Sequence, residues 1–587
     1  MEGPGSRAFS AGSAIQVKGR GRQAIAWVAA VALSSACGQG QRDARVPPAR
    51  PSVILISIDT LRADHVGVRS LTPSLDAFAK TAMRFTSAWS HAPLTLPAHA
   101  SILTGLLPTT HGVRDNAGFE LRGGSTLAER LKKAGYATGG FVSSTVMRRE
   151  TGMARGFDTF DDQMPGQGLE RLGSATVELA LKFAASHRAA PFFLFVHLYD
   201  PHTPYAAPSD FANRGESDYD REVAAADAAV GVLLDGLRAL GIESPAIVVT
   251  ADHGEGLGDH GEAEHGLLLY AEALRVPLLV ARPDGAGAGR VIGATVRHVD
   301  IAATLLNLAG LNSDDTDGAP LVPDLPGGSR VAYSETWYPR LHFGWSELAS
   351  AAEGRWHYIA GPKPELYDVE ADPREASNLN ADPARPGAAM ARYLATVRES
   401  AKSSSSGPIS GEAEERLRSL GYLGATRASK NSGGANPRDK LRFYQPFMTA
   451  FTQAHAARGR GDLPRAVEQY RRAIDLLRLE EGLVVPKLHF GLGDSLARLG
   501  RTDAALKAFR AELAIEPTSI ETRTAMGSLY WSMGRDRDAR GVITGIVTEN
   551  PKAGEREDAA VIQAFEVLGD DVGAAAWRRR VQERGRK

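Results

Sequence analysis

The sequence predicts an α/β domain with a mostly parallel sheet and helices on both faces, followed by an all-helical repeat domain. Three observations carry this prediction. Apolar runs rich in β-branched and aromatic residues end in polar residues at 52–59, 191–200 and 246–254, which is typical of strands buried on both faces. Helical stretches alternate with these runs, as expected for a parallel sheet. From residue 438 onward the pattern is helical and repetitive.

Length and composition indicate a folded protein of two or three domains. The chain has 587 residues, of which 43% are hydrophobic and 23% charged, and its net charge is −1. A charge so close to zero argues against a general affinity for nucleic acid, so no nucleic-acid partner is expected. Any recognition of anions must therefore come from a local arrangement of residues.

The N-terminus has the order of a secretory signal. Lys18, Arg20 and Arg22 precede an apolar run at 24–36, and small residues end that run. The run is shorter than the ~20 residues that span a bilayer. We therefore expect export.

Cys37, the only cysteine, excludes an intramolecular disulfide and follows the apolar run directly. This position resembles the lipobox of bacterial lipoproteins, although Ser34 stands where leucine is usual. The resemblance implies a signal peptide at 1–36, a lipid on Cys37, a tether at 37–50 and a membrane-tethered protein in the periplasm or on the cell surface. The alternative is an ordinary cleaved signal or an uncleaved anchor, with Cys37 incidental.

The remaining boundaries follow from composition. The α/β domain is expected at 51–400, and shorter strands from about 328 predict a small closing subdomain at 328–400. Serine- and glycine-rich segments indicate a linker at 401–437 before the helical domain at 438–587. Within the α/β domain, the stretch 125–136 is predicted to be a helix capped by Ser125 and ended by Gly135.

The helical domain carries an internal repeat of 34 residues. The pairs that recur at this offset are Gly500 and Gly534, Ala505 and Ala539, and Pro517 and Pro551. The period resembles that of tetratricopeptide repeats, which implies a surface for a protein partner. A generic array of helical hairpins is the alternative, with nearly the same consequence.

Acidic residues at strand ends predict a metal site. Asp59, Asp200 and Asp252 each follow a predicted strand, and the carboxyl ends of parallel strands meet at one edge of a sheet. Asp252 is followed by His253, and this pair together with Asp59 could chelate a divalent ion. Mixed oxygen and nitrogen ligands admit zinc, manganese or calcium, with at least one ion expected. For an isolated Asp-His pair, an N-cap beside a surface histidine would be the simpler interpretation.

Several motifs then resemble the alkaline phosphatase superfamily, and particularly its sulfatase family. They are "ISIDTLRADHVG", "TPSLDAFAKTAMRFTSAWS", "ADHGEGLGDHGEAEHGLLLYAEALRVPLLV" and "PELYDVEADPREASNL", which stand in family order across about 51–400. The resemblance implies the α/β fold of that superfamily and hydrolysis of sulfate or phosphate esters at a metal site.

The chain departs from the sulfatases at the nucleophile. Their motif C/S-x-P-S-R, whose first residue is oxidised to formylglycine, falls here on Thr95, Pro97 and His99. Threonine cannot give that aldehyde. The lysine-histidine motif of sulfatases is also missing, because the chain reads "GYATGGFVSS" there.

Nucleotide pyrophosphatases and phosphodiesterases resemble this stretch more closely. They carry a threonine nucleophile in the context T-x-P-x-H, followed by "TG", "HG" and an Asp-Asn pair. The matching positions here are Thr95, Pro97, His99, Thr104-Gly105, His111-Gly112 and Asp115-Asn116. The resemblance implies that Thr95 attacks phosphorus and that Asn116 donates a hydrogen bond to a non-bridging oxygen. Coordination to a dication would stabilise the threonine alkoxide.

The second-metal motif of that branch, D-x-x-x-H, is absent, so a one-metal site is favoured. Its expected ligands are Asp59, Thr95, Asp252 and His253. His202 is the candidate acid for the leaving oxygen. His265 lies near the position of a substrate-binding lysine in sulfatases, with an offset of one residue, and a histidine on the rim is the alternative. His260 and His342 are left open as further ligands or rim residues. Arg114 could pair with a substrate anion, and a surface ion pair is the alternative.

The sequence therefore predicts an exported, metal-dependent hydrolase of phosphate or phosphonate esters that acts on a small or polymeric anionic substrate through Thr95. Three alternatives stay open. They are a sulfatase that works without formylglycine, a transferase of phospho groups, and an inactive surface scaffold that uses its repeats. The transferases of the superfamily carry several membrane helices, whereas this sequence has one apolar run.

Overall fold

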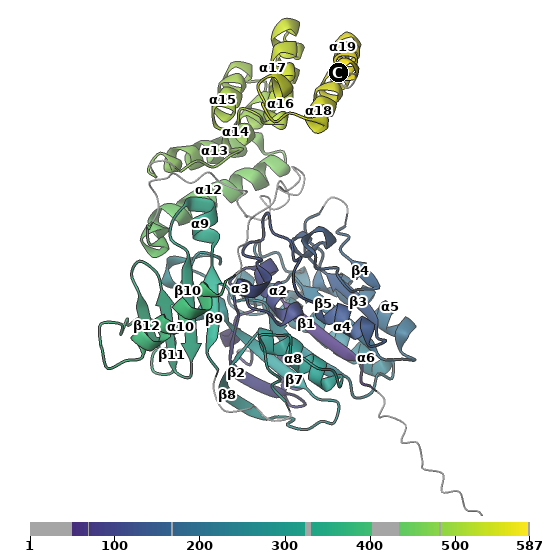
Figure 1. Cartoon of the computed structure of the whole chain (residues 1–587), viewed down its shortest axis with the longest axis vertical. Helices are drawn as coiled ribbons and strands as arrows, with labels where there is room; N and C mark the ends of the chain where they lie inside the picture. The colour runs from purple at the N-terminus through teal and green to yellow at the C-terminus, as the bar shows by residue number, and fades with distance from the viewer. Residues whose placement is uncertain are drawn as a thin grey trace, which may run out of the picture. The chain divides into compact units, whose positions relative to one another are not determined.

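The computed structural model describes residues 50–68, 70–165, 168–322, 330–401, 434–480 and 483–584. An eight-stranded sheet forms its centre, in the order β4-β3-β5-β1-β6-β7-β2-β8 (Figure 1). Its strands are β1 (Val53–Ile58), β2 (Met83–Trp89), β3 (Ala137–Val142), β4 (Thr159–Asp161), β5 (Phe192–Leu198), β6 (Ala246–Ala251), β7 (Arg275–Ala281) and β8 (Val291–Arg297). Only β7 runs antiparallel to its neighbours, β6 and β2.

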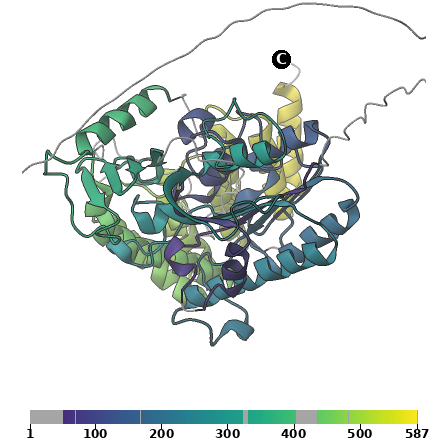
Figure 2. The same ribbon diagram turned by 90° about the horizontal axis from the view of Figure 1, so that it is seen from below.

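Helices cover both faces of the sheet (Figures 1 and 2). Their mutual contacts divide them into two groups. One group holds α1 (Pro73–Ala79), α5 (Gly173–His187) and α6 (Asp218–Ala239), and the other holds α2 (Thr95–Thr104), α4 (Leu127–Lys133) and α8 (Val299–Leu308). β1, β5 and β6 are buried along their whole length, as their apolar sequences require. This confirms the predicted α/β class.

Short helices punctuate the loops between these elements. They are α3 (Pro108–His111), α7 (Ala271–Leu274), α9 (Tyr338–Phe343) and the 3₁₀ turns η1 (Ala63–His65), η2 (Thr145–Met147), η3 (Arg149–Thr151), η4 (Ser209–Phe211), η5 (Asp259–Gly261) and η6 (Pro437–Lys440).

The cap of α4 lies one residue later than the sequence suggested. Thr126, not Ser125, caps the helix, because its hydroxyl accepts the Glu129 N–H at 3.1 Å. The Glu129 carboxylate accepts the Thr126 N–H in return, at 2.8 Å, which completes a capping box. Glu129, three residues after Thr126, therefore decides which residue caps the helix. Gly135 follows the helix with φ +92°, as a helix stop requires.

A second, four-stranded antiparallel sheet follows, in the order β12-β11-β10-β9. Its strands are β9 (Ala332–Thr336), β10 (Leu348–Glu353), β11 (Trp356–Ala360) and β12 (Glu365–Asp368), and α10 (Gly387–Glu399) packs on β10 and β11. This is the small closing sheet that the sequence predicted.

Glu375 joins the closing sheet to the central domain. Its carboxylate contacts His357 Nδ1 of β11 at 2.5 Å and accepts the Ala271 N–H of α7 at 2.7 Å. Its carbonyl oxygen lies 3.2 Å from His260 Nε2. One buried side chain and its own backbone thus hold both sides of the joint.

The C-terminal region is a row of helix pairs. The pairs are α12 (Leu441–Gly459) with α13 (Leu463–Leu477), α14 (Leu488–Arg498) with α15 (Thr502–Ile515), α16 (Ile520–Ser532) with α17 (Asp536–Thr548), and α18 (Glu555–Val567) with α19 (Asp571–Arg584). Gly500 and Gly534, two of the predicted repeat positions, turn the chain inside their pairs with φ +72° and +68°. Ala505 and Ala539 are buried at helix contacts, which confirms the repeat.

The first helix of this row packs on the α/β domain. The ring of Phe343 lies 5.4 Å from that of Tyr444, and the ring of Trp345 lies 6.2 Å from that of Phe443. Arg438 also pairs with Glu365 at 2.7 Å. α12 is therefore part of the continuous apolar core of the α/β domain as well as the first repeat helix.

In the part of the chain that the structure describes, no helix has both the length and the apolar composition needed to cross a membrane. The expected signal, the Cys37 lipid and the tether up to residue 49 lie outside the described residues, as does most of the expected linker, 402–433.

The packing of α12 predicts different outcomes for two truncations. A chain that ends at 433 exposes Phe343 and Trp345, and each large apolar side chain contributes roughly 1.5–3 kcal/mol when buried. A chain that ends at 517 keeps both residues covered. We expect the first chain to have a clearly lower melting temperature than the full protein and the second to match it in the hydrolase transition, measured by scanning calorimetry. Equal melting temperatures in all three chains would show that α12 does not stabilise the domain.

Candidate active site

The site lies where two neighbouring parallel strands end. β1 pairs with β6 so that Ile58 stands beside Ala251. Asp59 and Asp252, the next residues of each strand, are therefore brought side by side, and both are fully buried. The sheet register alone dictates this approach, although the two residues are far apart in the sequence.

Thr95 enters the same place at the first residue of α2, a helix that is buried throughout. Its Oγ1 lies 3.3 Å from Asp59 Oδ2 and 3.5 Å from His253 Nε2. The threonine hydroxyl therefore lies within reach of the same ion that the acidic residue and the imidazole could bind.

Asp59, Asp252 and His253 can hold a metal ion, because their ligand atoms lie within 4.8 Å of one another. His253 Nε2 is 3.8 Å from Asp59 Oδ1 and 3.4 Å from Asp252 Oδ2. Neither of these two carboxylate oxygens has a hydrogen-bond partner among the described residues. Since a buried anion without partners is costly, a divalent cation fits this donor set.

The protonation of His253 suits a metal ligand. Its Nδ1 lies 2.9 Å from the Gly254 carbonyl oxygen, which can only accept a hydrogen bond. Nδ1 therefore carries the proton, and the lone pair of Nε2 faces the two carboxylates. Burial raises the pKa of Asp59 to about 7, although His253 and the Thr95 hydroxyl act against this rise. A bound cation would reverse this effect.

Two further histidines complete the surroundings, and the sequence analysis did not assign them to the metal. His197 Nε2 lies 3.2 Å from Asp59 Oδ2. His99 uses both ring nitrogens: Nδ1 lies 2.8 Å from the Thr95 carbonyl oxygen, and Nε2 lies 2.9 Å from Ser57 Oγ. Burial lowers the pKa of His99 to about 3 and that of His197 to about 4, so both are neutral at neutral pH.

His99, His197 and Asp252 form a second group with metal-ligand spacing. Both nitrogens of His99 already contact protein groups, which favours a supporting role for this ring. His197 stands beside Ser57 in the β5–β1 register, two residues before Asp59. The pairing of its strand with β1, which ends at Asp59, could have indicated that His197 lies near the metal group. A histidine inside an apolar strand is, however, usually interpreted as a core residue.

Asn116 lies beside the threonine. Its Oδ1 accepts the Leu96 N–H at 2.8 Å, while its Nδ2 is buried and has no partner among the described residues. The preceding Asp115 accepts the Asn116 N–H at 2.7 Å and contacts His342 Nε2. The amide nitrogen is thus held next to Thr95 with its donors unused.

His265 lies next to His253, and His202 lies next to His265. The His265 ring is 4.4 Å from that of His253 and 5.1 Å from that of His202. His265 Nδ1 contacts Glu255 Oε1 at 3.0 Å, and His202 Nδ1 contacts the Thr203 carbonyl oxygen at 2.5 Å. Burial lowers the pKa of His265 to about 4 and that of His202 well below its usual range.

Three sequence expectations change. Asp200 does not join the metal group, because its carboxylate turns away to accept the Gly173 N–H at 2.9 Å. Arg114 is not a surface residue but forms a buried ion pair with Glu335. His260 contacts Glu272 at 2.6 Å, in a loop outside the metal group.

Comparison with known proteins places this geometry in a family. A family model described as Sulfatase matches residues 51–311. This part of the chain is a sulfatase-family domain. A model for the C-terminal part of N-sulphoglucosamine sulphohydrolase matches 258–398, and a tetratricopeptide repeat model matches 451–520. The named relatives of the domain are sulfatases, and sulfatase-family homologues are ester hydrolases.

Among similar proteins, choline-sulfatase of Rhizobium meliloti is 26% identical over 434 residues, which cover 57% of this chain and 84% of that protein. The structure of the phosphonate monoester hydrolase of Agrobacterium radiobacter matches with 23% identity and a TM-score of 0.51, over 60% of this chain and 96% of that one. A structure solved with its substrate D-glucosamine-2-N,6-O-disulfate matches with 20% identity and a TM-score of 0.51, over 60% and 98%. These structures share the fold.

The metal group leads to a direct prediction. Replacing Asp252 with asparagine removes one negative charge from the group, so we expect the bound divalent ion found by elemental mass spectrometry after dialysis to be lost. Asp200→Asn is the matched control, because its carboxylate lies outside the group, and it should keep the metal. Equal metal content in both variants would place the ion elsewhere.

Proposed function

We propose that the sulfatase-family domain hydrolyses phosphate or phosphonate esters with Thr95 as nucleophile. One observation carries this proposal. The Thr95 hydroxyl lies within 3.5 Å of both Asp59 and His253, at the position where formylglycine stands in related sulfatases. A divalent ion held by Asp59, Asp252 and His253 would lower the pKa of the hydroxyl and neutralise charge on the substrate.

The residues of the chain divide the remaining work. Thr95 Oγ1 attacks phosphorus, the bond to the leaving oxygen breaks, and water then hydrolyses the phospho-threonine. The free Nδ2 of Asn116 can donate to a non-bridging oxygen, where charge builds up in the transition state. Donors of this kind typically contribute on the order of 3 kcal/mol to the barrier.

We propose His202 as the group that exchanges a proton with the leaving oxygen, with the neighbouring His265 as a contact of the substrate. In the substrate-free site the lowered pKa of His202 leaves the ring neutral. An anionic substrate beside the ring would raise the pKa of His202 and favour its protonated form. The ring would therefore take up the proton when the ester binds. An aryl leaving group needs this proton least, which makes aryl esters the substrates of choice for a first assay.

Sulfate esters are the second candidate substrates. The similarity to choline-sulfatase favours them, whereas the threonine at position 95 favours phosphorus. We also propose export with a lipid on Cys37, which rests on the basic and apolar residues that precede it.

Thr95→Ala should abolish turnover of an aryl phosphodiester, by a factor on the order of 10⁴ or more, because the nucleophile is removed. Thr95→Ser keeps a hydroxyl and should retain measurable activity. Thr110→Ala is the matched control in the same stretch and should behave like the unmodified protein. Peptide mass spectrometry of quenched reactions should find a phosphoryl adduct on Thr95. Turnover of an aryl sulfate alone, with no adduct at Thr95, would assign the protein to sulfate esters and refute the proposed nucleophile.

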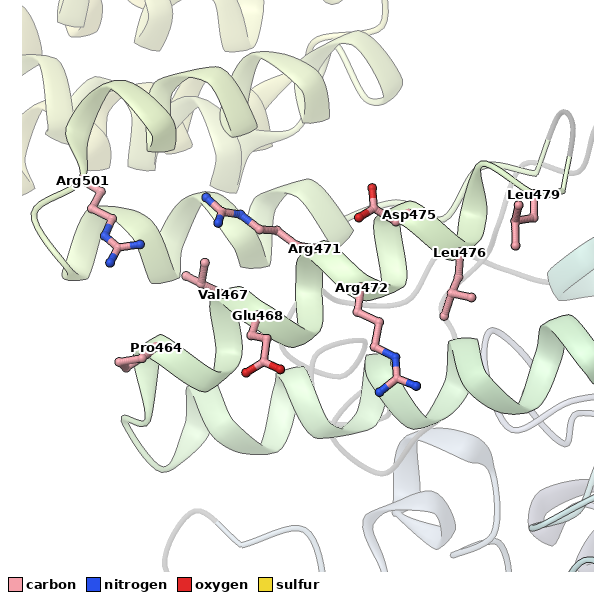
Figure 3. A pocket seen from close by; sticks show the side chains of 9 residues that line it. All are labelled: Pro464, Val467, Glu468, Arg471, Arg472, Asp475, Leu476, Leu479 and Arg501. Atoms are coloured by element: carbon pink, nitrogen blue, oxygen red, sulfur yellow. The ribbon is translucent and has the colours of Figure 1, made fainter.

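We further propose that the repeats bind an acidic segment of a partner protein along α13. A groove of about 640 Å³ is lined mainly by residues of this helix (Figure 3). Three arginines and two acidic residues line it: Arg471, Arg472, Arg501, Glu468 and Asp475. Asp475 pairs with Arg478, and none of the three arginines of the groove takes part in an ion pair among the described residues. Leu479, 72% exposed, offers an apolar contact at the end of the groove.

This surface can be tested with a fluorescein-labelled peptide of glutamate and leucine residues. Arg471→Glu combined with Arg472→Glu should abolish its binding, measured by fluorescence anisotropy, because the charge of the groove is reversed. Arg556→Glu on α18 is the matched control and should leave binding unchanged. Identical affinities in all three proteins would exclude the groove on α13 as the docking surface.

A further inference from the structure

A second concave region lies beside the β2–β7 pair, and none of the candidate metal ligands lines it. Its volume is about 810 Å³, within the range of about 300–1,000 Å³ typical of sites for small ligands. Five arginines and three carboxylates line the cleft. Its walls come from η1, β2, β7 and the segment 373–376 of the closing subdomain. The positive charge of this cleft contrasts with the near-zero net charge of the whole chain.

The three carboxylates of the cleft are already engaged. Arg62 contacts Asp64 at 2.8 Å and Asp259 at 2.9 Å. Glu272 contacts His260 at 2.6 Å. These pairs hold the three carboxylates against Arg62 and His260, and the five arginines exceed the carboxylates by two.

Three arginines of the cleft, Arg84, Arg275 and Arg374, take part in no ion pair among the described residues. Arg275 donates two hydrogen bonds to the Thr86 carbonyl oxygen, at 3.0 and 2.6 Å, which fixes the side chain against β2. Burial lowers its pKa more than Asp64 and Glu375 raise it. Arg84 donates a long hydrogen bond, 3.4 Å, to the Val66 carbonyl oxygen, and Arg374 is exposed.

We infer that this cleft binds a small ligand that carries at least two sulfate or phosphate groups. The planar guanidinium groups of Arg84, Arg275 and Arg374 match the geometry of these oxyanions. The arginines of the cleft outnumber its carboxylates by two, five against three, and two anionic groups on one small molecule match this excess and the volume. This inference stands independently of the reaction proposed for Thr95.

A concave site between a strand pair and the closing subdomain suits a discrete small molecule better than a membrane surface, which needs a flat or protruding basic face. The ion pairs of Arg62 and Glu272 keep the walls in place without a ligand. Binding should therefore require little rearrangement, and because the charges are partly exposed, it should weaken as salt is added.

The test is isothermal titration of the full chain carrying Thr95→Ala, which prevents turnover. The two probes are D-glucosamine-2-N,6-O-disulfate and fructose 1,6-bisphosphate, which separate sulfate from phosphate as the bound group, and N-acetylglucosamine is the uncharged control. We expect the charged probes to bind and the uncharged sugar not to bind. Arg84→Gln combined with Arg374→Gln should weaken this binding on the order of tenfold or more, and Arg374→Gln alone, at an exposed position, should weaken it without any effect on folding.

Two controls separate the cleft from the candidate active site. Arg188→Gln changes an exposed arginine at the end of α5 and should leave binding unchanged. Asn116→Ala removes a contact of the candidate active site, and binding in the cleft should survive it. Equal affinities in the arginine variants and the parent chain, or no binding of either probe, would overturn the inference. If the cleft binds its probe while Thr95 forms no adduct in the unmodified protein, the inference about the cleft is confirmed and the proposed reaction is refuted.

Discussion

Two carboxylates that lie buried side by side form the constraint on which the site depends. The β1–β6 register places Asp59 next to Asp252, and one oxygen of each carboxylate has no hydrogen-bond partner among the described residues. The neighbouring His99 and His197 supply no positive charge, because burial lowers the pKa of each. A protein interior tolerates such a pair only with protons or a cation between them. Everything around the pair follows from this requirement: the lone pair of His253 Nε2 points inward, and the hydroxyl of Thr95 lies beside it.

The same arrangement explains why a threonine can replace the oxidised residue of related sulfatases. A side chain at the start of α2 reaches the acidic pair from the helix end, and Asn116 holds that end in place through the Leu96 N–H. The first residue of α2 is therefore oriented toward the two carboxylates, and the reaction depends on which nucleophile this residue carries. The proposal of phosphorus rather than sulfur as the reacting atom rests on the hydroxyl at this position.

Sequence patterns predicted the sheet, the repeats and the approach of Asp59, Asp252 and His253, because strand ends and repeat periods are properties of the backbone. They did not predict side-chain direction beyond a strand. Asp200 also ends a strand, yet its carboxylate turns to the N–H of Gly173 at the start of α5. His197 was missed for the opposite reason, since its neighbours are apolar and only the pairing with β1 reveals the nearby Asp59. The double role of α12 was likewise invisible, because its aromatic residues suit a repeat helix and a domain core equally well.

The backbone around Glu375 connects regions that a topology diagram keeps apart. The glutamate points inward and joins the closing sheet to the segment that follows the candidate metal ligands, while the adjacent Arg374 lines the arginine-rich cleft. Opening of the closing subdomain would break both arrangements at once. The small sheet and the loop that follows the candidate ligand His253 therefore share contacts at Glu375. Any molecule bound in the cleft would add its binding free energy to the stability of this joint.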